Sequence, residues 1–183
     1  ILGKGKTGSR SLNETEARLQ LAYGAAGMGT WDWDVTSGNL YWNDRQFELF
    51  DLPKSPGPIH IESAIARIHP DDRERVITAN AISVGDNQPF REEFRVISEN
   101  GDVRWLSGRG NTLNHDEDGR PKSLTGVNYD ITERKNLELH LVQSNLILEA
   151  RVAERTRDLE QEMRERQKTQ EALSHSQRIE LIG

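Results

Sequence analysis

The sequence predicts an α+β domain with one antiparallel sheet, followed by a single long helix. The first observation is the order of the patterns: two short alternating segments, several short amphipathic segments, then three alternating segments joined by turn residues. This order is typical of an antiparallel sheet with its helices on one face. The second observation is that residues 131–182 contain neither Pro nor Gly, which favours an uninterrupted helix.

Composition narrows the function classes. The net charge of -6 and a pI near 5.4 argue against nucleic-acid binding, which needs a basic face. The absence of cysteine excludes disulfides and thiolate catalysis. No apolar run approaches the ~20 residues of a membrane helix, so we expect a cytoplasmic chain without membrane contact. Because the sequence lacks an initial Met, we expect a fragment of a longer protein.

The N-terminal region predicts a linker and then a helix. Residues 1–10 are rich in Gly and Lys, which is typical of a linker. Ser11 and Asn13 each precede a Glu by three residues, the spacing of a capping box, and therefore predict a helix over residues 11–28. The domain then occupies residues 29–131, and the long helix occupies residues 132–183.

The first strands and helices follow from alternation and caps. Trp31, Trp33 and Val35 alternate with polar residues, which predicts a half-buried strand, and a turn at 36–39 leads to the return strand. Either Asn43 or the following Asp begins a short helix that a proline ends. Residues 61–68 predict a further short helix.

The second half of the domain predicts one helix and three strands. His69 and Pro70 open the helix, with Pro at its first position and two acids following. The strands are expected at residues 90–97, 103–113 and 122–129. Asn100-Gly101 is the strongest hairpin signal between two of them.

Asp130 marks the joint between the last strand and the long helix. It lies three residues before Glu133, so we expect Asp130 to cap the helix and Glu133 to reach back to it. Such a joint can pass a change in the domain into the helix. The alternative, that many helices begin this way and transmit nothing, stays open at this point.

The long helix, on the order of 75 Å long at ~1.5 Å per residue, predicts a coiled coil. One heptad frame holds Val152 and Leu159 at one core position, while Leu141 and Leu148 belong to another frame. The register therefore slips between Leu148 and Val152. A solvated or weakly paired helix is the open alternative. The expected seam contains Leu141, Leu148, Val152, Thr156, Leu159, Met163 and Leu173.

Candidate chemistry is sparse. His69 is the one histidine beside the expected core, but its place before Pro70 favours a helix start over haem ligation. The other histidines have no metal-ligand spacing, and no catalytic constellation stands out. Apolar and aromatic residues could line a pocket or simply form core: Trp31, Trp33, Phe47, Phe50, Ile65, Ile68, Phe94, Val96, Trp105, Val127 and Tyr129.

Several segments, in combination and in order, resemble the PAS domain with its C-terminal PAC motif. The resemblance covers roughly residues 11–135 and implies a five-stranded antiparallel sheet with helices on one face, in a sensor or interaction module that is often dimeric. The matching segments are Trp31-Asp32-Trp33-Asp34, His69-Pro70-Asp71-Asp72-Arg73, Phe94-Arg95-Val96, Asn100-Gly101-Asp102-Val103-Arg104-Trp105 and Gly126-Val127-Asn128-Tyr129-Asp130-Ile131-Thr132-Glu133-Arg134.

The same resemblance implies how the domain communicates. Asp130, Ile131 and Thr132, followed by Glu133 and Arg134, match the motif that couples such domains to an output helix. Glu154-Arg155-Thr156 resembles signalling helices of sensor kinases and cyclic-di-GMP enzymes, and residues 177–183 resemble the opening of a histidine-kinase dimerisation helix. We therefore expect a non-enzymatic part of a sensor histidine kinase, forming a parallel homodimer that regulates a downstream kinase domain.

Cofactors and alternatives follow from the same family. The absence of cysteine excludes a cysteine-adduct flavin, and no matched residue supports haem or FAD, so no cofactor is expected. A small-molecule ligand of unspecified identity fits a sensor. The alternatives are a ligand-free dimerisation module, a haem- or flavin-binding sensor, and a regulator of a cyclic-di-GMP enzyme.

Overall fold

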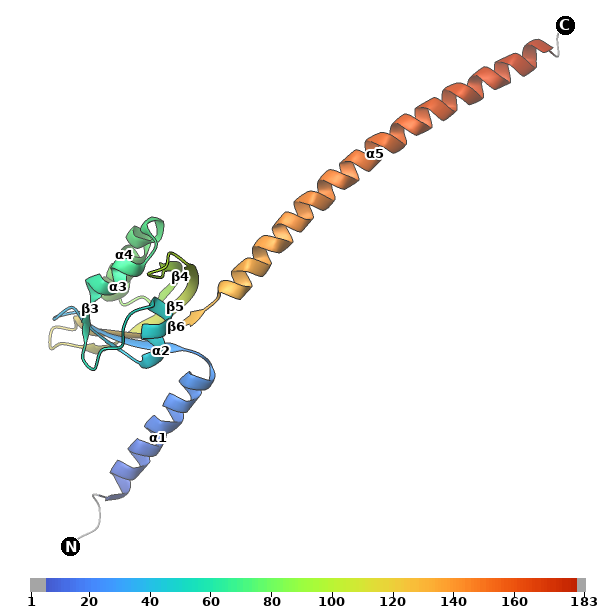
Figure 1. Cartoon of the computed structure of the whole chain (residues 1–183). Helices are drawn as coiled ribbons and strands as arrows, with labels where there is room; N and C mark the ends of the chain where they lie inside the picture. The colour runs from blue at the N-terminus through green and yellow to red at the C-terminus, as the bar shows by residue number, and fades with distance from the viewer. Residues whose placement is uncertain (1–5, 181–183) are drawn as a thin grey trace. The chain divides into compact units, whose positions relative to one another are not determined.

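The structure is a computed structural model that describes the backbone of residues 6–180 and the side chains of residues 14–172 (Figure 1). The chain divides into two compact units, one ending at Lys135 and one beginning at Asn136. From residue 6 onward, the first unit contains the sheet, four helices and the first turn of the fifth. The second unit is the remainder of that fifth helix.

The first unit is built on one antiparallel sheet, which confirms the predicted α+β class. The strand order is β3-β2-β1-β6-β5-β4, so β1 and β6 lie side by side at its centre. Within residues 6–180 the sheet has six strands, not five: the two-residue β3, just before the helix predicted at 61–68, pairs with β2 and was not predicted. The strands are β1 (Gly29–Asp34), β2 (Asn39–Trp42), β3 (Ile59–His60), β4 (Phe90–Ile97), β5 (Val103–His115) and β6 (Pro121–Asp130).

The helices keep most of their predicted bounds. Asn43 caps α2, because its side chain accepts a hydrogen bond from the Gln46 N–H at 2.9 Å. The first helix begins at Lys6, five residues before the predicted cap at Ser11. The Lys, Ser and Arg between them tolerate a helix, and only Gly8 disfavours one, by about 1 kcal/mol. The helices are α1 (Lys6–Ala25), α2 (Asp44–Phe50), α3 (Ile61–Arg67), α4 (Pro70–Gly85) and α5 (Thr132–Glu180).

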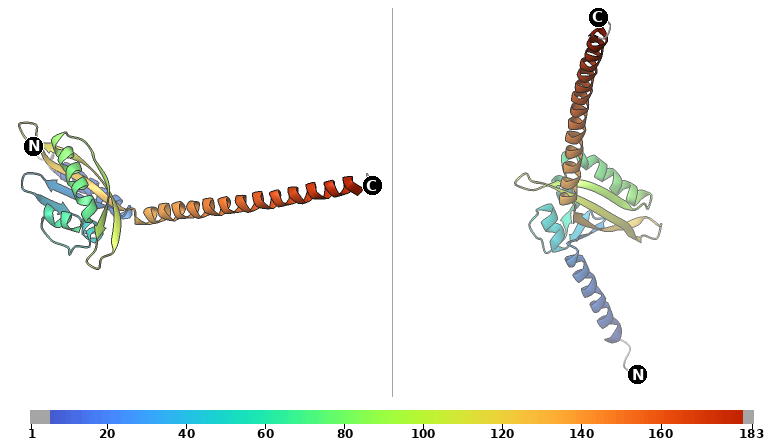
Figure 2. Two further views of the ribbon diagram at one scale, coloured as in Figure 1. Left: turned by 90° about the horizontal axis from the view of Figure 1, so that it is seen from above. Right: turned by 90° about the vertical axis from the view of Figure 1, so that its right-hand side faces the viewer.

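The core lies between the sheet and helices α2, α3 and α4 (Figure 2). Alternate strand residues face it, as the period of two requires, and they pack against Leu49 of α2 and Val76 of α4. The indole of Trp31 lies over Gly126 of the adjacent strand β6 and over Gly110 of β5, the strand beyond it. A Cβ on Gly126 would lie only 2.3 Å from that ring, so only glycine fits beneath it. The first unit is thus filled at its centre by its own tryptophan.

Candidate functional site

The joint between β6 and α5 is fixed to the sheet through the backbone of one residue. Ile131 is buried, and its N–H donates to the carbonyl oxygen of Trp105 at 2.9 Å. The hydroxyl of Thr132 accepts a hydrogen bond from the Trp105 N–H, also at 2.9 Å. Both peptide groups of a β5 residue therefore hold the first residues of the helix, and these bonds tie the helix start to the sheet.

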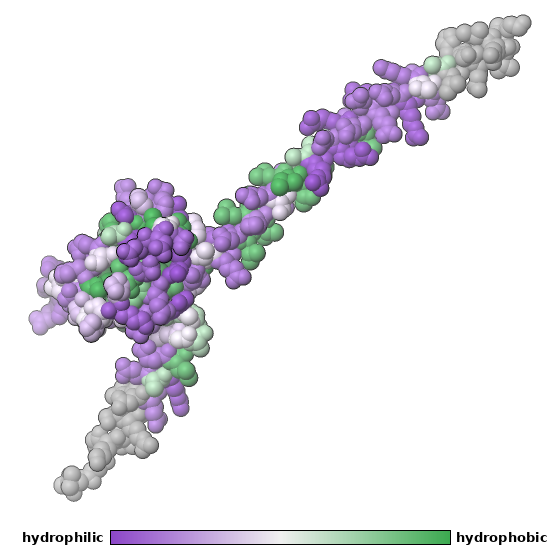
Figure 3. Space-filling view, viewed as in Figure 1, coloured by the Kyte–Doolittle hydropathy of each residue, from purple (hydrophilic) through white to green (hydrophobic). Residues whose placement is uncertain are grey.

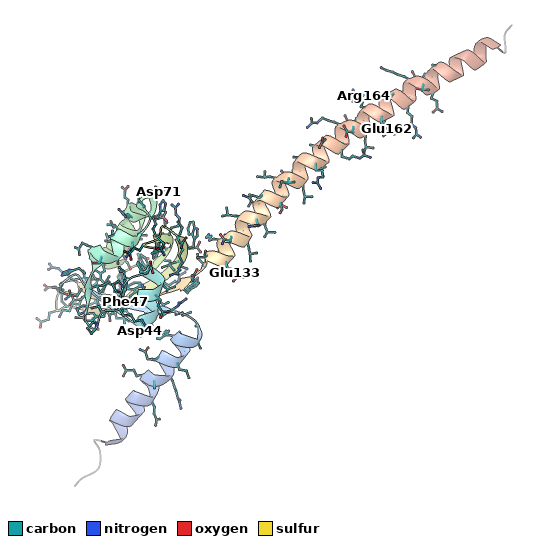
Figure 4. All side chains as sticks on the ribbon, in the orientation of Figure 1. Asp44, Phe47, Asp71, Glu133, Glu162 and Arg164 are labelled. Atoms are coloured by element: carbon teal, nitrogen blue, oxygen red, sulfur yellow. The ribbon has the colours of Figure 1, made fainter. Side chains whose placement is uncertain are left out.

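Asp130 stabilises this joint in a different way from the predicted cap. The helix begins at Thr132, so Ile131 occupies the cap position and Asp130 precedes it. The Asp130 carboxylate still accepts from the Thr132 N–H at 2.8 Å. Glu133 does not close a capping box: it is exposed at the start of α5, without a bond to the Asp130 backbone among the described contacts (Figure 4). Strand β6 continues to Asp130, one residue past the predicted strand end, and the Ile131 N–H still bonds to β5, so the cap position moves from Asp130 to Ile131.

Arg104 links Asp130 to the helix layer. Its Nε lies 3.2 Å from an oxygen of the Asp130 carboxylate. Its Nη1 donates to the carbonyl oxygens of Glu48 and Leu49, at 2.7 and 2.8 Å. Those carbonyls belong to the last turn of α2, where a positive charge is favourable. Arg104 therefore connects the last turn of α2 to Asp130 by direct contacts.

Arg134 and Lys135, in the first turn of α5, bind the edge strand β4. Arg134 and Lys135 place a nitrogen 2.6 and 2.7 Å from the two oxygens of the Glu93 carboxylate on β4. The hydrogen bond from Lys135, and then that from Arg134, lowers the pKa of Glu93. Of the five predicted coupling residues, four contact the sheet or its edge, and Glu133 faces away.

A small cavity lies in the core between the sheet and the helices. Its volume is about 60 Å³, and six of the predicted pocket residues line it: Trp31, Trp33, Phe50, Ile65, Ile68 and Phe94. The remainder of the lining was not predicted: Leu40, Trp42, Gln46, Ile61, Ala64, Val76, Asn80, Phe90 and Asn128. Leu40 and Trp42 lie two residues apart on β2 and therefore share one face, but only the strand pairing places Asn128 of β6 on that face as well.

Five predicted pocket residues lie elsewhere. Phe47 and Val96 are buried in the core without lining the cavity. Trp105, Val127 and Tyr129 are corrections to the prediction, because they occupy the opposite face of the sheet from the cavity. Each is a direct neighbour of an inward residue along its strand, and side chains alternate between the two faces. Aromatic character alone did not reveal which face each would take.

The cavity wall carries polar atoms that need partners. The Trp31 indole N–H donates to the Asn128 side-chain oxygen at 3.2 Å. The indole nitrogens of Trp33 and Trp42 and the side-chain oxygen of Gln46 are buried, and no partner is recorded for them within the described part of the chain. A buried unpaired group costs about 1–3 kcal/mol, and such groups commonly mark a bound water or ligand. These three groups belong to residues that line the cavity, and each would gain from a hydrogen-bond partner.

The cavity does not fit a large cofactor. Pockets for drug-sized ligands span roughly 300–1,000 Å³, and the space over the central glycines is occupied by Trp31. His69, the haem candidate, precedes α4, where its Nδ1 accepts from the Asp71 N–H at 3.3 Å, and it does not line the cavity. Between residues 14 and 172 no group of three or more ligating side chains is placed to hold a metal ion. The residues present thus fit neither haem nor FAD.

Helix α5 carries a long run of exposed apolar side chains. The seam residues Leu141, Leu148, Val152, Leu159 and Met163 are 44–70 % exposed. Thr156 donates to the Val152 carbonyl oxygen at 2.9 Å, and Leu173 lies outside the described side chains. Figure 3 shows that apolar residues gather along the first half of α5. They also include Leu137, Leu139, Val142, Leu146 and Ile147.

None of the helices, within the described residues, combines the length and the apolar character that crossing a bilayer requires. The apolar side chains are interrupted by charges throughout α5. A run of this kind is suited to pairing with another helix.

Comparison with known proteins yields one family. A profile described as the PAS fold matches residues 39–128. A solved structure of a sensory box histidine kinase/response regulator from Burkholderia thailandensis is 32% identical, covers 72% of this chain and 97% of its own, and superposes with a TM-score of 0.62.

Two curated relatives come from different signalling systems. The probable diguanylate cyclase DgcE of Escherichia coli is 31% identical over 126 residues, covering 69% of this chain and 11% of that protein. The sensor protein FixL of Bradyrhizobium diazoefficiens is 32% identical over 112 residues, covering 61% and 22%. The chain therefore spans less than a quarter of the length of these relatives.

Proposed function

Because the chain belongs to the PAS fold family, we propose that it is the sensor and dimerisation module of a larger signalling protein. In this proposal a change in the core, or at the interface between two copies, reaches the paired α5 helices through Asp130, Ile131 and Thr132. One observation carries it: the backbone of Trp105 holds both Ile131 and Thr132, so the helix start cannot move independently of the sheet.

The partner of α5 in this proposal is a second copy of α5. An isolated helix of mostly polar residues gains little from propensity alone, and most helical stability comes from packing an apolar face. The exposed apolar residues of α5 supply such a face. A parallel pair places both junctions at the same end, so the two domains act on one output. The seam uses Leu141, Leu148, Val152, Thr156, Leu159, Met163 and Leu173.

The output we propose is a histidine kinase. Its support is the similarity to the Burkholderia thailandensis sensory box histidine kinase and to the sensor protein FixL. The similarity to the probable diguanylate cyclase DgcE supports regulation of a cyclic-di-GMP enzyme as the alternative output. Either output would be driven by the same paired helix, so the alternatives share one mechanism in this chain.

A second candidate is a dimerisation module without a ligand. The small volume of the cavity, about 60 Å³, favours this candidate. The unpaired atoms of Trp33, Trp42 and Gln46 favour a small ligand instead. Native mass spectrometry separates the two candidates, because a bound molecule adds a discrete mass to the folded chain that disappears on denaturation.

Cysteine cross-linking tests the paired helix, since the chain has no cysteine of its own. A disulfide needs Cα atoms roughly 4.4–6.8 Å apart, which the seam of a parallel, in-register pair provides. We expect Val152→Cys to form a disulfide-linked dimer under mild oxidation. The matched control Glu154→Cys lies two residues along the same helix, outside the seam, and should cross-link far less. Equal cross-linking, or none at Val152, would refute the pairing.

A further inference from the structure

A second set of contacts joins the helix layer to the start of α5, apart from the Asp130 joint. It consists of side chains from α4, β4, β5 and α5, and we name it the Trp105 cluster: Asp72, Glu93, Arg95, Trp105, Arg134 and Lys135. Its members come from positions up to 63 residues apart in sequence, and none of its contacts involves the cavity wall directly.

The first contact joins α4 to the edge strand. The carboxylate of Asp72 accepts from Nε and Nη2 of Arg95, both at 2.9 Å, and from the Arg95 backbone N–H at 2.9 Å. The Asp72 side chain is only 8% exposed. A bidentate, largely buried pair of this kind fixes the orientation of the guanidinium as well as its position.

The second contact passes from β4 to the helix through one indole. Arg95 and Trp105 lie opposite each other in the β4–β5 ladder, with the guanidinium 5.4 Å from the centre of the indole ring. The ammonium of Lys135 lies 5.3 Å from the same ring. Both distances fall within the ~6 Å range of a cation–π contact. One indole therefore contacts a cation from the sheet and a cation from α5.

The third contact holds those α5 cations in place. Glu93 lies two residues before Arg95 on β4, on the same face of the strand. Its carboxylate binds Arg134 and Lys135 at 2.6 and 2.7 Å. Lys135 is thus held between a carboxylate and an aromatic ring, and its position depends on the strand that also carries Arg95.

The far end of the cluster lies next to the cavity. Asp72 is on α4, four residues before Val76 and eight before Asn80, and both of these residues line the cavity. Residues at this spacing lie on one side of a helix. A molecule that enlarges the cavity would displace this side of α4, and Asp72 would move with it.

We propose that Glu93 and Trp105 are positioning residues for α5, and that the Trp105 cluster forms a second route by which movement of α4 reaches the first turn of that helix. The inference rests on the proposed function, in which α5 is the output. It differs from the Asp130 joint, which reaches α2 through Arg104 rather than α4. The Asp130 joint contacts α2 and the Trp105 cluster contacts α4, and residues of both helices line the cavity.

Amide hydrogen exchange of the whole chain tests this route without a ligand. The reporter is the Lys135 N–H, which bonds the Ile131 carbonyl oxygen at 2.9 Å and opens when the first turn of α5 frays. We expect Asp72→Asn to raise the exchange rate there about two- to fivefold, the size of one cation–π contact at an exposed site. The matched control is Asp86→Asn, at the other end of α4 and outside the cluster, and it should leave this rate unchanged.

A double variant tests whether Asp72 affects the start of α5 through Lys135 or by lowering the stability of the whole domain. Lys135→Gln removes the cation from the indole but keeps a polar side chain of similar length at a position that is 23 % exposed, so it should not prevent folding. If the route is continuous, Asp72→Asn adds nothing to the rates of neighbouring first-turn amides once Lys135→Gln is present. Multiplying effects, or an unchanged Lys135 amide in Asp72→Asn, would each overturn the inference. None of these outcomes bears on Val152→Cys cross-linking, so the two proposals fail separately.

Discussion

Replacing Asp72 by Asn removes one charge from the domain while keeping the shape of the side chain. The Asp72 carboxylate accepts three hydrogen bonds from Arg95, and these lower the pKa of Asp72 from 3.8 to about 2, against the opposing effect of burial. At about 1.4 kcal/mol for each pH unit, that gap corresponds to about 2 kcal/mol of folding free energy. We expect Asp72→Asn to lower the free energy of unfolding by about this amount at neutral pH.

The sign of the pH dependence follows from the lowered pKa. A carboxylate with a folded-state pKa below its unfolded value stabilises the fold fully above the unfolded value, here 3.8. That stabilisation is lost as the pH falls through about 2, because the folded protein then binds the same proton. The difference between the original chain and Asp72→Asn should therefore be constant from neutral pH to about pH 5 and shrink below about pH 4.

Urea unfolding followed by tryptophan fluorescence measures both quantities. The denaturation midpoint of each protein is determined at neutral pH, about pH 5 and about pH 3, with Asp86→Asn as the control. Asp86 follows the last residue of α4. Its carboxylate accepts no hydrogen bond among the described contacts, so the stability of Asp86→Asn should match that of the original chain. A difference for Asp72→Asn that stays the same from neutral pH to about pH 3 would show that shape, not charge, causes the loss. A difference below about 0.5 kcal/mol would refute the estimate itself.

Three further variants test the core and the joint. Trp31→Ala should open a cavity over the glycines and cost about 3–5 kcal/mol, with added indole raising the melting temperature of this variant and not of the original chain. Gly126→Ala should prevent stable folding, because the new Cβ would lie 2.2 Å from a backbone oxygen, whereas Gly57→Ala, with open space around it, should fold normally in circular dichroism. Thr132→Val removes the acceptor for the Trp105 N–H and should cost about 1–3 kcal/mol in urea unfolding, with the largest gain in hydrogen exchange at that amide.

Local signals predicted the elements of the first unit because local physics decides them. Asn43 caps α2 since its side chain reaches the N–H of Gln46 three residues on, a contact that needs no other part of the chain. Pro70 opens α4 at the one helical position where a missing N–H does no harm. Strand alternation at residues 90–97 predicted β4 to the residue. Each of these features is settled within a few residues.

The cavity and the cluster depend on pairings that no local signal contains. Trp105 was expected in the core for its aromatic ring, yet the register that pairs it with Arg95 places it on the opposite face. Gln46 lines the cavity because α2 crosses β1 at Gly29, where a Cβ would meet its side-chain oxygen at 2.2 Å. The strand β3 exists because a two-residue segment reaches the edge of β2. All three follow from tertiary contacts rather than from propensity.

The volume of the cavity limits what a ligand can do in the proposed sensor. A cavity near 150 Å³ holds benzene, so about 60 Å³ admits roughly two or three non-hydrogen atoms. At the ceiling of about 1.5 kcal/mol per atom, such a ligand supplies at most about 4.5 kcal/mol of binding free energy.

Moving a two-state equilibrium from 1:99 to 99:1 requires a difference of about 5.5 kcal/mol between the two states. A molecule confined to the present cavity cannot provide that difference. The two arrangements of α5 must therefore be close in free energy before any signal arrives, or the signal must enlarge the cavity by displacing Trp31. The predicted seam of α5 suits the first condition, because its heptad frame slips between Leu148 and Val152 and its polar residue, Thr156, lowers the stability of a pair.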